Sequence, residues 1–396
     1  MTWRIVYKIK KLNHVFCLHK SYSTTSLFPK PGDKVILGMS GGVDSSVSAY
    51  LLQQKGYDVE GVYMRNWDSR DEDSSPCPSL EDQQDVARVC EQLGIKWRLV
   101  DFSREYWIKV FAKALEEFEA GRTPNPDVAC NREIKFGVLM ERILGDGAWI
   151  ATGHYARLDR SGQGVRLLRG SDRNKDQTYF LSTVPAPQLS RAIFPIGEMN
   201  KADVKALARK LGLATAGKRE SMGICFVGNK RKFGDFIAEY IPQNPGPVKT
   251  HEGLLIGEHK GLFHYTIGQA SRFCHGSSKW VVWRKDMSTN TLVVVPGTNH
   301  PLLFSKALVA GDWNWIGSPP SELDRDGDEM IVEAQVRYRQ NAERARVIRR
   351  RDTSADRYEV RFEREVRGIT PGQMVVVWRG EECLGAGVID HVLDGG

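Results

Sequence analysis

The chain has 396 residues, 41% hydrophobic and 27% charged, an ordinary globular mixture without repeats or low-complexity tracts. Its length predicts two or three domains, and no apolar run could span a bilayer, so we expect a soluble protein that does not contact membranes. The net charge of +7 comes mostly from residues 1–30, because the rest has 50 basic and 49 acidic residues. Net charge is therefore no evidence for nucleic-acid binding.

Residues 1–30 are basic, lack Asp and Glu, and contain five Ser or Thr between positions 21 and 26. This composition is typical of a mitochondrial transit peptide, and it predicts a location in the matrix. The alternative is a disordered basic tail. We expect cleavage before Pro31.

Strand and helix patterns alternate in the first half of the chain. We expect strands at 34–39, 58–64, 97–102 and 149–152, and helices at 45–54, 81–93 and 104–120. The polar stretch 68–79 is predicted to be a loop. Alternating elements of this kind predict an α/β domain with a parallel sheet covered on both faces.

The second half has a different pattern. Asn200 and Asp203 resemble a helix cap, and beyond Gly261 helical patterns almost vanish. Short strands separated by turns then predict a β-barrel or a β-sandwich, of which we favour the barrel. The predicted organisation is a transit peptide at 1–30, a parallel-sheet domain at 31–195, a small central domain at 196–262 and a C-terminal β-barrel at 263–396.

Residues 40–45, SGGVDS, lie between a predicted strand and a predicted helix. Glycines there let the backbone approach a phosphate closely, and N–H groups at a helix N-terminus point at the anion. Asp44 could help to hold Mg²⁺. The sequence has neither the Gly-Lys-Ser/Thr end of a Walker A loop nor a Gly-x-Gly-x-x-Gly pattern here. The alternative is a plain glycine turn with a helix cap.

The seven cysteines form no Cys-x-x-Cys pair, so we predict no metal site, and their odd number argues against a disulfide framework. Cys130 and Cys225 lie in the distinctive strings GRTPNPDVACN (121–131) and SMGICFVG (221–228). Cys90 lies on an apolar helical stripe. We interpret Cys90 and Cys383 as small buried hydrophobic residues.

Residues 38–45 resemble the pyrophosphate loop (PP-loop) of ATP-pyrophosphatases, which split ATP into AMP and pyrophosphate. Together with the two cysteine strings, the chain from about 34 to 391 resembles the tRNA-specific 2-thiouridylase family, and the leader points to its mitochondrial member. Further matching strings lie at 151–155, 175–181, 264–269, 337–340 and 369–373. The run 270–274 departs from the family pattern, which puts the contact made by that loop in doubt.

The resemblance implies ATP-dependent 2-thiolation of the wobble uridine of mitochondrial tRNAs for lysine, glutamate and glutamine. A uridine 2-carbonyl is a poor electrophile, so AMP would first be transferred to its oxygen. Sulfur from a cysteine persulfide would then displace AMP. The implied cofactors are ATP and Mg²⁺, and the implied partners are tRNA and a persulfide donor from a cysteine desulfurase system.

The resemblance also implies site residues: Cys225 as the persulfide carrier, Cys130 as its partner thiol and Asp127 as the proton-transfer group. The predicted ATP contacts are Gly38, Met39, Ser40, Gly41, Gly42, Val43, Asp44, Ser45, Met64 and Gly153. The predicted tRNA contacts are Asn125, Pro126, Asp127, His154, Lys175, Asp176, Gln177, Arg337, Tyr338 and Gln373.

Local charge agrees with two of these roles. Cys130 stands at the predicted start of a helix, near Arg122, Arg132 and Lys135, which would favour its thiolate. Residues 331–351 hold seven arginines against Glu333 and Glu343, which suits phosphate contacts. The alternative for this basic stretch is a solvated charged face.

Two other functions remain open. An amidating synthetase of the same superfamily would need an ammonia source, which we do not find, and it would leave Cys130 and Cys225 without a role. A tRNA-binding protein that lacks catalysis would be expected to have a damaged loop or a missing cysteine. Pyrophosphate release that depends on tRNA separates these alternatives.

Overall fold

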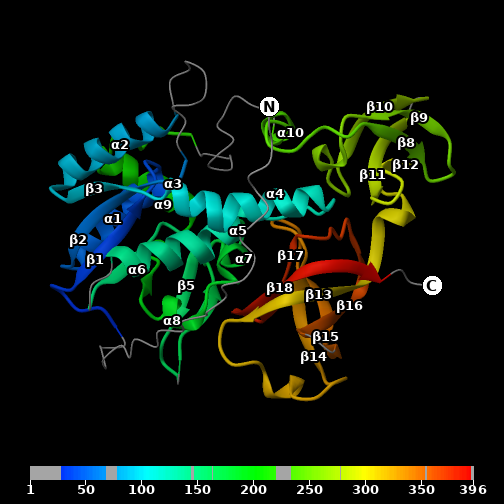
Figure 1. Cartoon of the computed structure of the whole chain (residues 1–396). Coiled ribbons are helices and arrows are strands. Elements are labelled where there is room, and N and C mark those ends of the chain that lie inside the picture. Colours follow the sequence, from blue (N-terminus) through cyan, green and yellow to red (C-terminus); the bar gives the residue numbers. More distant parts are fainter. Residues whose placement is uncertain are drawn as a thin grey trace, which may run out of the picture.

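The computed structural model describes residues 28–67, 78–143, 147–162, 164–219, 233–276, 278–352 and 355–393. Three sheets organise this part of the chain (Figure 1). Most of the predicted leader, most of the predicted loop at 68–79, and the string 221–228 with Cys225 lie outside the described residues. No helix that the structure describes combines the length and apolarity needed to cross a membrane.

The first sheet is parallel, with strand order β3-β2-β1-β4-β7. Its strands are β1 (Lys34–Met39), β2 (Asp58–Arg65), β3 (Lys96–Asp101), β4 (Trp149–Ala151) and β7 (Ala192–Ile193). The four strands predicted from the sequence are confirmed to within one residue at each end. The parallel α/β fold is also confirmed, because every strand pair in this sheet runs in parallel.

Helices cover both faces of this sheet (Figure 1). The helices of this unit are α1 (Val43–Gln54), α2 (Pro78–Leu93), α3 (Ser103–Tyr106), the π-helical η2 (Trp107–Phe111), α4 (Ala112–Glu119), α5 (Pro126–Cys130), the π-helical η3 (Asn131–Val138), α6 (Leu139–Ile143), α7 (Thr178–Leu181), α8 (Ala186–Leu189) and α9 (Lys201–Lys210). Strand β1 is buried on both faces because its side chains alternate: Val35 and Leu37 join the core under α1 and α2, whereas Ile36 joins the core under η2 and η3.

The second sheet has strand order β10-β11-β12-β8-β9. The strands of this central unit are β8 (Gly246–Thr250), β9 (Leu255–His259), β10 (Ala270–His275), β11 (Ser278–Asp286) and β12 (Thr291–Pro296), with α10 (Phe233–Ile237) before them and η4 (Leu262–His264) between β9 and β10.

Two predicted domain boundaries differ from the structure. The boundary after residue 262 falls inside the central sheet, because β8 pairs with β12 from the other side of it. The boundary after residue 195 is also displaced, because Val204 and Ala208 of α9 pack against Val43 and Val47 of α1. The first unit therefore includes α9.

The last strands form a closed barrel, since β13 pairs with both β16 and β18. The barrel consists of β13 (Phe304–Trp315), β14 (Glu329–Gln335), β15 (Glu343–Asp352), β16 (Ala355–Arg367), β17 (Met374–Arg379) and β18 (Glu382–Leu393), with the short helices η5 (Pro301–Leu303) and η6 (Ser321–Leu323). Closure confirms the barrel over the sandwich. The hairpin β5 (Ala156–Asp159) and β6 (Arg166–Arg169) of the first unit extends this sheet beyond β18.

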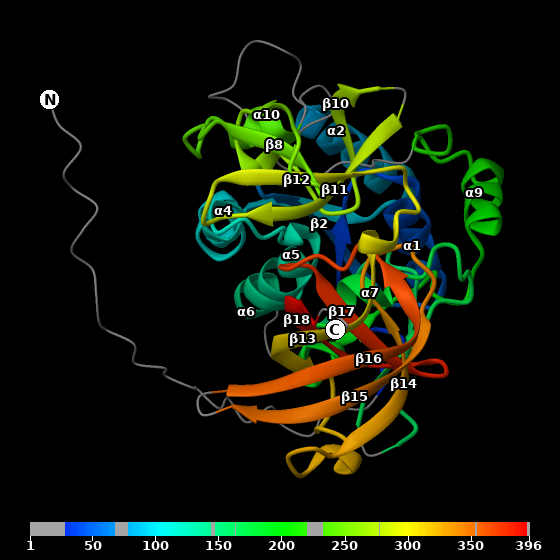
Figure 2. The ribbon, with the colours of Figure 1, turned by 90° about the vertical axis from the view of Figure 1, so that its right-hand side faces the viewer.

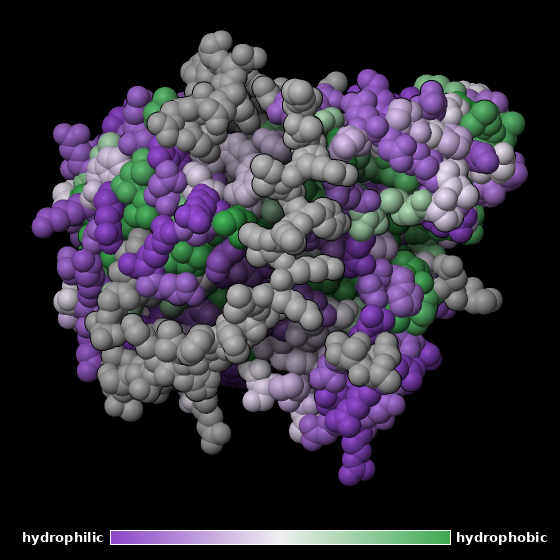
Figure 3. Space-filling model, in the orientation of Figure 1, coloured by the Kyte–Doolittle hydropathy of each residue, from purple (hydrophilic) through white to green (hydrophobic). Residues whose placement is uncertain are grey.

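The three units meet around the 121–131 segment and α5. Figure 2 shows the central sheet stacked above the barrel, with the first unit behind them and α9 at its outer side. On the face seen in Figure 3, hydrophobic side chains form small groups between hydrophilic ones.

Candidate active site

The glycine turn 40–42 joins β1 to α1 at the carboxyl end of the strand. Gly41 has a φ of +72°, and a Cβ there would lie 2.5 Å from the carbonyl oxygen of Asp82 in α2, so the turn requires glycine. Gly42 is the N-cap of α1 and has no side chain to accept hydrogen bonds from the first turn. The N–H groups of that turn can therefore bind an anion. The hydroxyls of Ser40 and Ser45 lie 3.3 Å apart beside it. This geometry fits a phosphate group.

Two distant segments, which contain the predicted ATP contacts Met64 and Gly153, come to this turn. The Cε of Met64 in β2 lies 3.5 Å from the position of a Cβ on Gly38. A Cβ on Gly153, just beyond β4, would lie 3.0 Å from the backbone of Asp44 and Ser45. The ends of three parallel strands therefore meet at one place, where open α/β sheets bind their ligands.

Asp44 has two partners that the sequence analysis did not identify. Lys201, the first residue of α9, donates from Nζ to both carboxylate oxygens at 2.7 Å. The hydroxyl of Tyr155 donates to Oδ1 at 2.8 Å. A Mg²⁺ ion at Asp44 would therefore compete with Lys201 for the same oxygens. No local pattern links positions 44 and 201, so only the fold reveals this pair.

We expect the Lys201–Asp44 pair to be energetically coupled, since the Lys201 side chain is only 10% exposed. Lys201→Met should destabilise the protein more than the double variant Lys201→Met, Asp44→Asn, because it leaves a carboxylate without its cation. A double-mutant cycle from urea unfolding should give a coupling of about 1–3 kcal/mol. If the two single substitutions have additive effects on the free energy of unfolding, the interaction between Lys201 and Asp44 contributes nothing to stability.

Asn125 begins the helix that carries Cys130. Its Oδ1 accepts a hydrogen bond of 3.3 Å from the backbone N–H of Val128, and Pro126 is the first helical residue. Cys130 therefore lies one turn inside the helix, and the prediction that it stands at the helix start is wrong. The partial positive charge of the helix N-terminus acts on Asp127, which lies in the first turn.

Asp127 and Cys130 are three positions apart on this helix, so they share one side of it. Cys130 is only 4% exposed and joins the core of the first unit. Burial raises the pKa of Asp127 above the ordinary carboxyl value of 3.8, while the positive charge of Lys135 opposes that shift. A raised pKa suits a group that accepts and returns a proton.

His154 is buried in the first unit. Its Nδ1 lies 2.7 Å from Thr152 Oγ1, and its ring packs against Phe136 and Phe194. Burial, with a smaller effect of Lys135, lowers the pKa of His154 well below the ordinary value of 6.5, so the ring is neutral at pH 7.

The barrel holds the 121–131 segment in place. Gln373 donates from Nε2 to the carbonyl oxygens of Thr123 and Pro124 at 2.8 and 3.2 Å. Arg122 pairs with Asp390 of β18 at 3.1 Å. Gln373 was predicted to contact tRNA; in the structure its amide positions the backbone that precedes Asp127.

Other residues predicted to contact tRNA also tie the units together. Arg337 donates from Nη2 to the carbonyl oxygens of Ile267 and Gly368, at 3.0 and 3.1 Å, which links the barrel to the segment after η4. The ring of Tyr338 packs on Phe180, with centroids 4.4 Å apart.

Three consecutive residues, Lys175, Asp176 and Gln177, precede α7. The Oδ2 of Asp176 accepts from the hydroxyl of Thr178 at 2.8 Å, and the Oε1 of Gln177 accepts from the N–H of Tyr155 at 2.9 Å. These two side chains therefore have structural partners within the first unit. The contacts of all three residues with tRNA stay predictions.

The basic stretch 331–351 is largely ion-paired. Its pairs, all between 2.8 and 3.2 Å, are Arg344–Glu363, Arg346–Glu329, Arg349–Asp356 and Arg350–Glu359. This arrangement favours the alternative of a solvated charged face, because paired arginines have less charge to offer a phosphate.

The predictions for Cys90 and Cys383 are confirmed, since each is 1% exposed. Burial raises the pKa of Cys90 to about 11 and also raises that of Cys383, so both thiols stay protonated at pH 7. Cys274 is exposed. Because Cys225 lies outside the described residues, its position relative to Cys130 stays a prediction.

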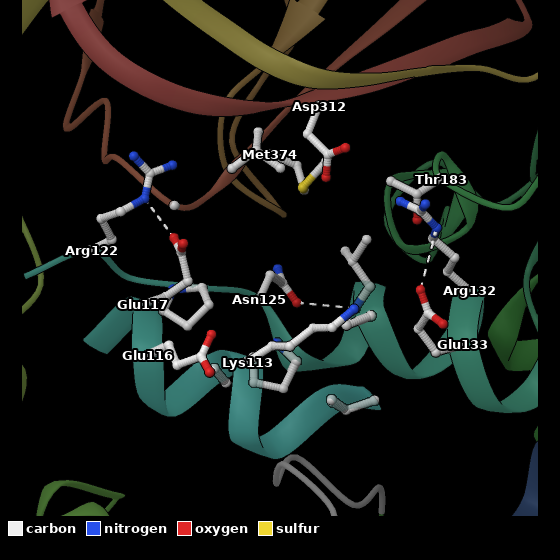
Figure 4. Close-up of a pocket in the computed structure, with 18 of the residues that line it drawn as sticks. Lys113, Glu116, Glu117, Arg122, Asn125, Arg132, Glu133, Thr183, Asp312 and Met374 are labelled. Atoms are coloured by element: carbon white, nitrogen blue, oxygen red, sulfur yellow. Dashed lines mark hydrogen bonds and ion pairs between the residues drawn. The ribbon is translucent and has the colours of Figure 1, made fainter. Parts of the chain in front are cut away.

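A cavity of about 570 Å³ lies between η2, α4 and α5 on one side and the barrel on the other (Figure 4). Asn125, Val128 and Arg132 line it, whereas Asp127 and Cys130 do not. Its charged lining is balanced, with five basic side chains, Lys109, Lys113, Arg122, Arg132 and Arg357, and five acidic ones, Glu116, Glu117, Glu133, Asp312 and Asp390. A neutral balance of this kind does not suit a polyanion.

The parallel sheet and its phosphate-binding turn define the first unit as a PP-loop ATP-pyrophosphatase domain, followed by a central unit and a β-barrel. Three family models match in this order: "tRNA methyl transferase HUP domain" at residues 33–229, "tRNA methyl transferase PRC-barrel domain" at 234–296 and "Aminomethyltransferase beta-barrel domain" at 305–389. A solved structure of NMN synthetase from Francisella tularensis aligns with 50% of this chain and 70% of its own, at 15% identity and a TM-score of 0.32.

Curated relatives match almost the whole chain. The tRNA-specific 2-thiouridylases MnmA of Bacillus velezensis and Bacillus subtilis are each 48% identical over 371 residues, which cover 93% of this chain and 98% of theirs. The protein of that name from Pseudomonas paraeruginosa is 48% identical over 90% of this chain and 94% of its own. The chain belongs to the tRNA-specific 2-thiouridylase family.

Proposed function

We propose that this protein is a tRNA-uridine 2-sulfurtransferase that splits ATP into AMP and pyrophosphate. The observation that carries the proposal is the phosphate-binding turn, with its required glycine at a φ of +72°, in a chain 48% identical to a 2-thiouridylase over 93% of its length. The turn supplies the pyrophosphate site that this chemistry needs, and the helix beginning at Pro126 supplies a carboxyl and a thiol.

In the first step the 2-oxygen of the uridine attacks the α-phosphorus of ATP. The bond between the α- and β-phosphates breaks, and the N–H groups of the 40–45 turn hold the departing pyrophosphate. The N3 proton of the base passes to the carboxylate of Asp127. Mg²⁺ bound with ATP would offset phosphate charge, and Asp44 would help to hold it only in competition with Lys201.

In the second step the outer sulfur of a persulfide on Cys225 attacks carbon 2, and AMP leaves with the former carbonyl oxygen. The thiolate of Cys130 then attacks the inner sulfur of Cys225, which breaks the persulfide bond and leaves the sulfur on the base, and Asp127 returns its proton to N3. The product is a disulfide between the two cysteines, which a thiol reductant must reduce. A cysteine desulfurase system would reload the persulfide.

We further propose that the substrates are mitochondrial tRNAs for lysine, glutamate and glutamine, modified at the wobble uridine, and that the protein works in the matrix. The basic, acid-free leader supports the location. Fusing residues 1–30 to a fluorescent protein tests it: fluorescence outside mitochondria would contradict the proposed location.

The function is tested by sulfur incorporation into mitochondrial tRNA. We expect purified protein with ATP, Mg²⁺ and a persulfide donor to produce tRNA that is retarded on a thiol-sensitive gel. Cys225→Ser and Cys130→Ser should produce none, because each removes a sulfur that the second step requires. Cys90→Ser is the matched control, as its thiol is buried in the core and should not take part.

If wild-type protein releases pyrophosphate with tRNA but yields no retarded tRNA, the ATP chemistry stands and thiolation is wrong. If Cys130→Ser still thiolates, the thiol of Cys130 is not part of the transfer.

A further inference from the structure

Lys285 brings an ammonium group from the central sheet to the 121–131 segment. Its Nζ lies 3.5 Å from the Oγ1 of Thr123, at the outer limit of a hydrogen bond. Two residues further on, Met287 fills the space beside Gly121, where an added Cβ would lie 2.3 Å from the methionine sulfur. The end of β11 is therefore packed against the start of this segment.

This ammonium group has no negative partner in the part of the chain that the structure describes. Burial alone lowers the pKa of Lys285 to about 8, and no carboxylate of the described residues offsets the effect. Two other partly buried lysines differ: Lys201 contacts Asp44, and Lys218 contacts Asp82 at 2.6 Å. The ammonium group of Lys285 is therefore partly desolvated without the carboxylate partner that those lysines have.

Its neighbour Arg122 does not fill the same role. The guanidinium of Arg122 is already held by Glu117 and Asp390, in contacts of 2.5 and 3.1 Å. Of these two cations near Thr123, Lys285 is thus the one without a carboxylate partner among the described residues. A group that would compensate it must be anionic and must reach the junction of the central sheet, the barrel and the 121–131 segment.

We propose that Lys285 binds a backbone phosphate of the tRNA, beside the nucleotide that is modified. This inference rests on the proposed function, in which residues 125–127 surround the target uridine. Thr123 lies four positions before Asp127 in the same segment, so Lys285 contacts the stretch of chain that leads to the proposed base site. Phosphate contacts set the register of a nucleic acid, whereas base contacts identify it.

A tRNA phosphate explains the position of Lys285 better than ATP does. In the proposed function the phosphates of ATP bind at the 40–45 turn, where the first N–H groups of α1 can donate to them. The chain beyond residue 30 has a net charge of only +1, so its overall charge does not by itself attract tRNA. Binding must then depend on a few well-placed cations.

The proposal predicts opposite effects on binding and on folding. Lys285→Met should weaken tRNA binding about tenfold or more, as expected for a lost hydrogen bond between charged groups. It should also reduce the slope of log affinity against log salt concentration by about 0.7, for one phosphate contact. Its melting temperature should equal or exceed that of the wild type, because the substitution removes a partly buried charge that has no counter-ion among the described residues. A lysine with only a structural role would lower the melting temperature instead.

The experiment measures binding of unmodified, fluorescently labelled tRNA to the full chain at several NaCl concentrations. Lys285→Arg keeps the charge and should keep the salt slope. Lys279→Met is the matched control, since it removes an exposed lysine from the other end of β11 and should change neither affinity nor slope. ATP affinity should be unchanged in all variants.

If the wild type binds and thiolates tRNA, and the tRNA affinity of Lys285→Met equals that of the wild type or is no weaker than that of Lys279→Met, the role of Lys285 is overturned. The proposed function would then still stand. A fall in ATP affinity without a fall in tRNA affinity would also overturn it. Failure of the wild-type protein itself to bind tRNA would overturn the proposed function, and this inference with it.

Discussion

Replacing Gly41 with alanine is expected to reduce tRNA-dependent pyrophosphate release by about 10²-fold or more, the usual consequence of displacing a reacting group by about 1 Å. A Cβ at this position would lie 2.5 Å from the carbonyl oxygen of Asp82 and 2.9 Å from its Cα, which are backbone atoms that cannot turn aside. The φ of +72° adds a strain of about 1–2 kcal/mol for a residue with a side chain. The turn must therefore move away from α2, and its N–H groups move with it.

The control for this prediction is Gly94→Ala. Gly94 has a similar φ of +65°, but a Cβ there meets nothing within 4 Å. It therefore suffers the same backbone strain without displacing the phosphate-binding turn. We expect Gly94→Ala to lose some thermal stability and to keep its activity. Equal activity of Gly41→Ala and Gly94→Ala would show that the turn does not hold the pyrophosphate.

The second large effect is expected for Asp127→Asn, which should reduce the rate of thiolation by about 10²–10⁴-fold, the usual contribution of a positioned acid or base. In the wild type the carboxylate of Asp127 must be ionised to accept the proton, so activity should fall as the pH drops through the pKa of Asp127. Burial places that pKa above 3.8. The acidic limb of the pH–rate profile should therefore lie above 3.8 and disappear in the variant.

The same substitution should not destabilise the fold. Between pH 3.8 and the raised pKa, the folded protein binds the Asp127 proton more tightly than the unfolded chain does. Folding stability from this group therefore falls as the pH rises through that window, and asparagine removes the loss. We expect the melting temperature of Asp127→Asn at pH 7 to be at or above that of the wild type. Glu141→Gln, an exposed carboxylate on α6, is the control and should keep wild-type activity.

Local patterns predicted the parallel sheet well. The apolar run that forms β1 and the glycine turn after it are contiguous, so chain neighbours alone determine both. The helix carrying Cys130 shows the limit of this approach. Its start was predicted too late, although Asn125 and Pro126 are a typical N-cap and first residue. Reading the cap would have placed Asp127, and not Cys130, at the positive end of the helix.

The domain boundaries could not be predicted because they depend on the pairing of strands that are far apart in the sequence. Strand β8 joins β12 across the hairpin region 255–286, and β13 closes the barrel by pairing with β18 near the end of the chain. A strand pattern shows that a segment is extended, but it does not identify the partner. Charge was misleading for the same reason, because most arginines of the 331–351 stretch meet carboxylates on neighbouring strands.

The sequence by itself determined the family, the phosphate-binding turn and the burial of Cys90 and Cys383, since motifs and apolar stripes are properties of consecutive residues. Only the tertiary structure decided which charges are satisfied. Lys201 lies 157 positions from Asp44 and neutralises it, whereas Lys285 lies 162 positions from Thr123 and meets no carboxylate among the described residues. The free energy of a charge depends on burial and on the nearest opposite charge, and both arise only when distant segments pack together.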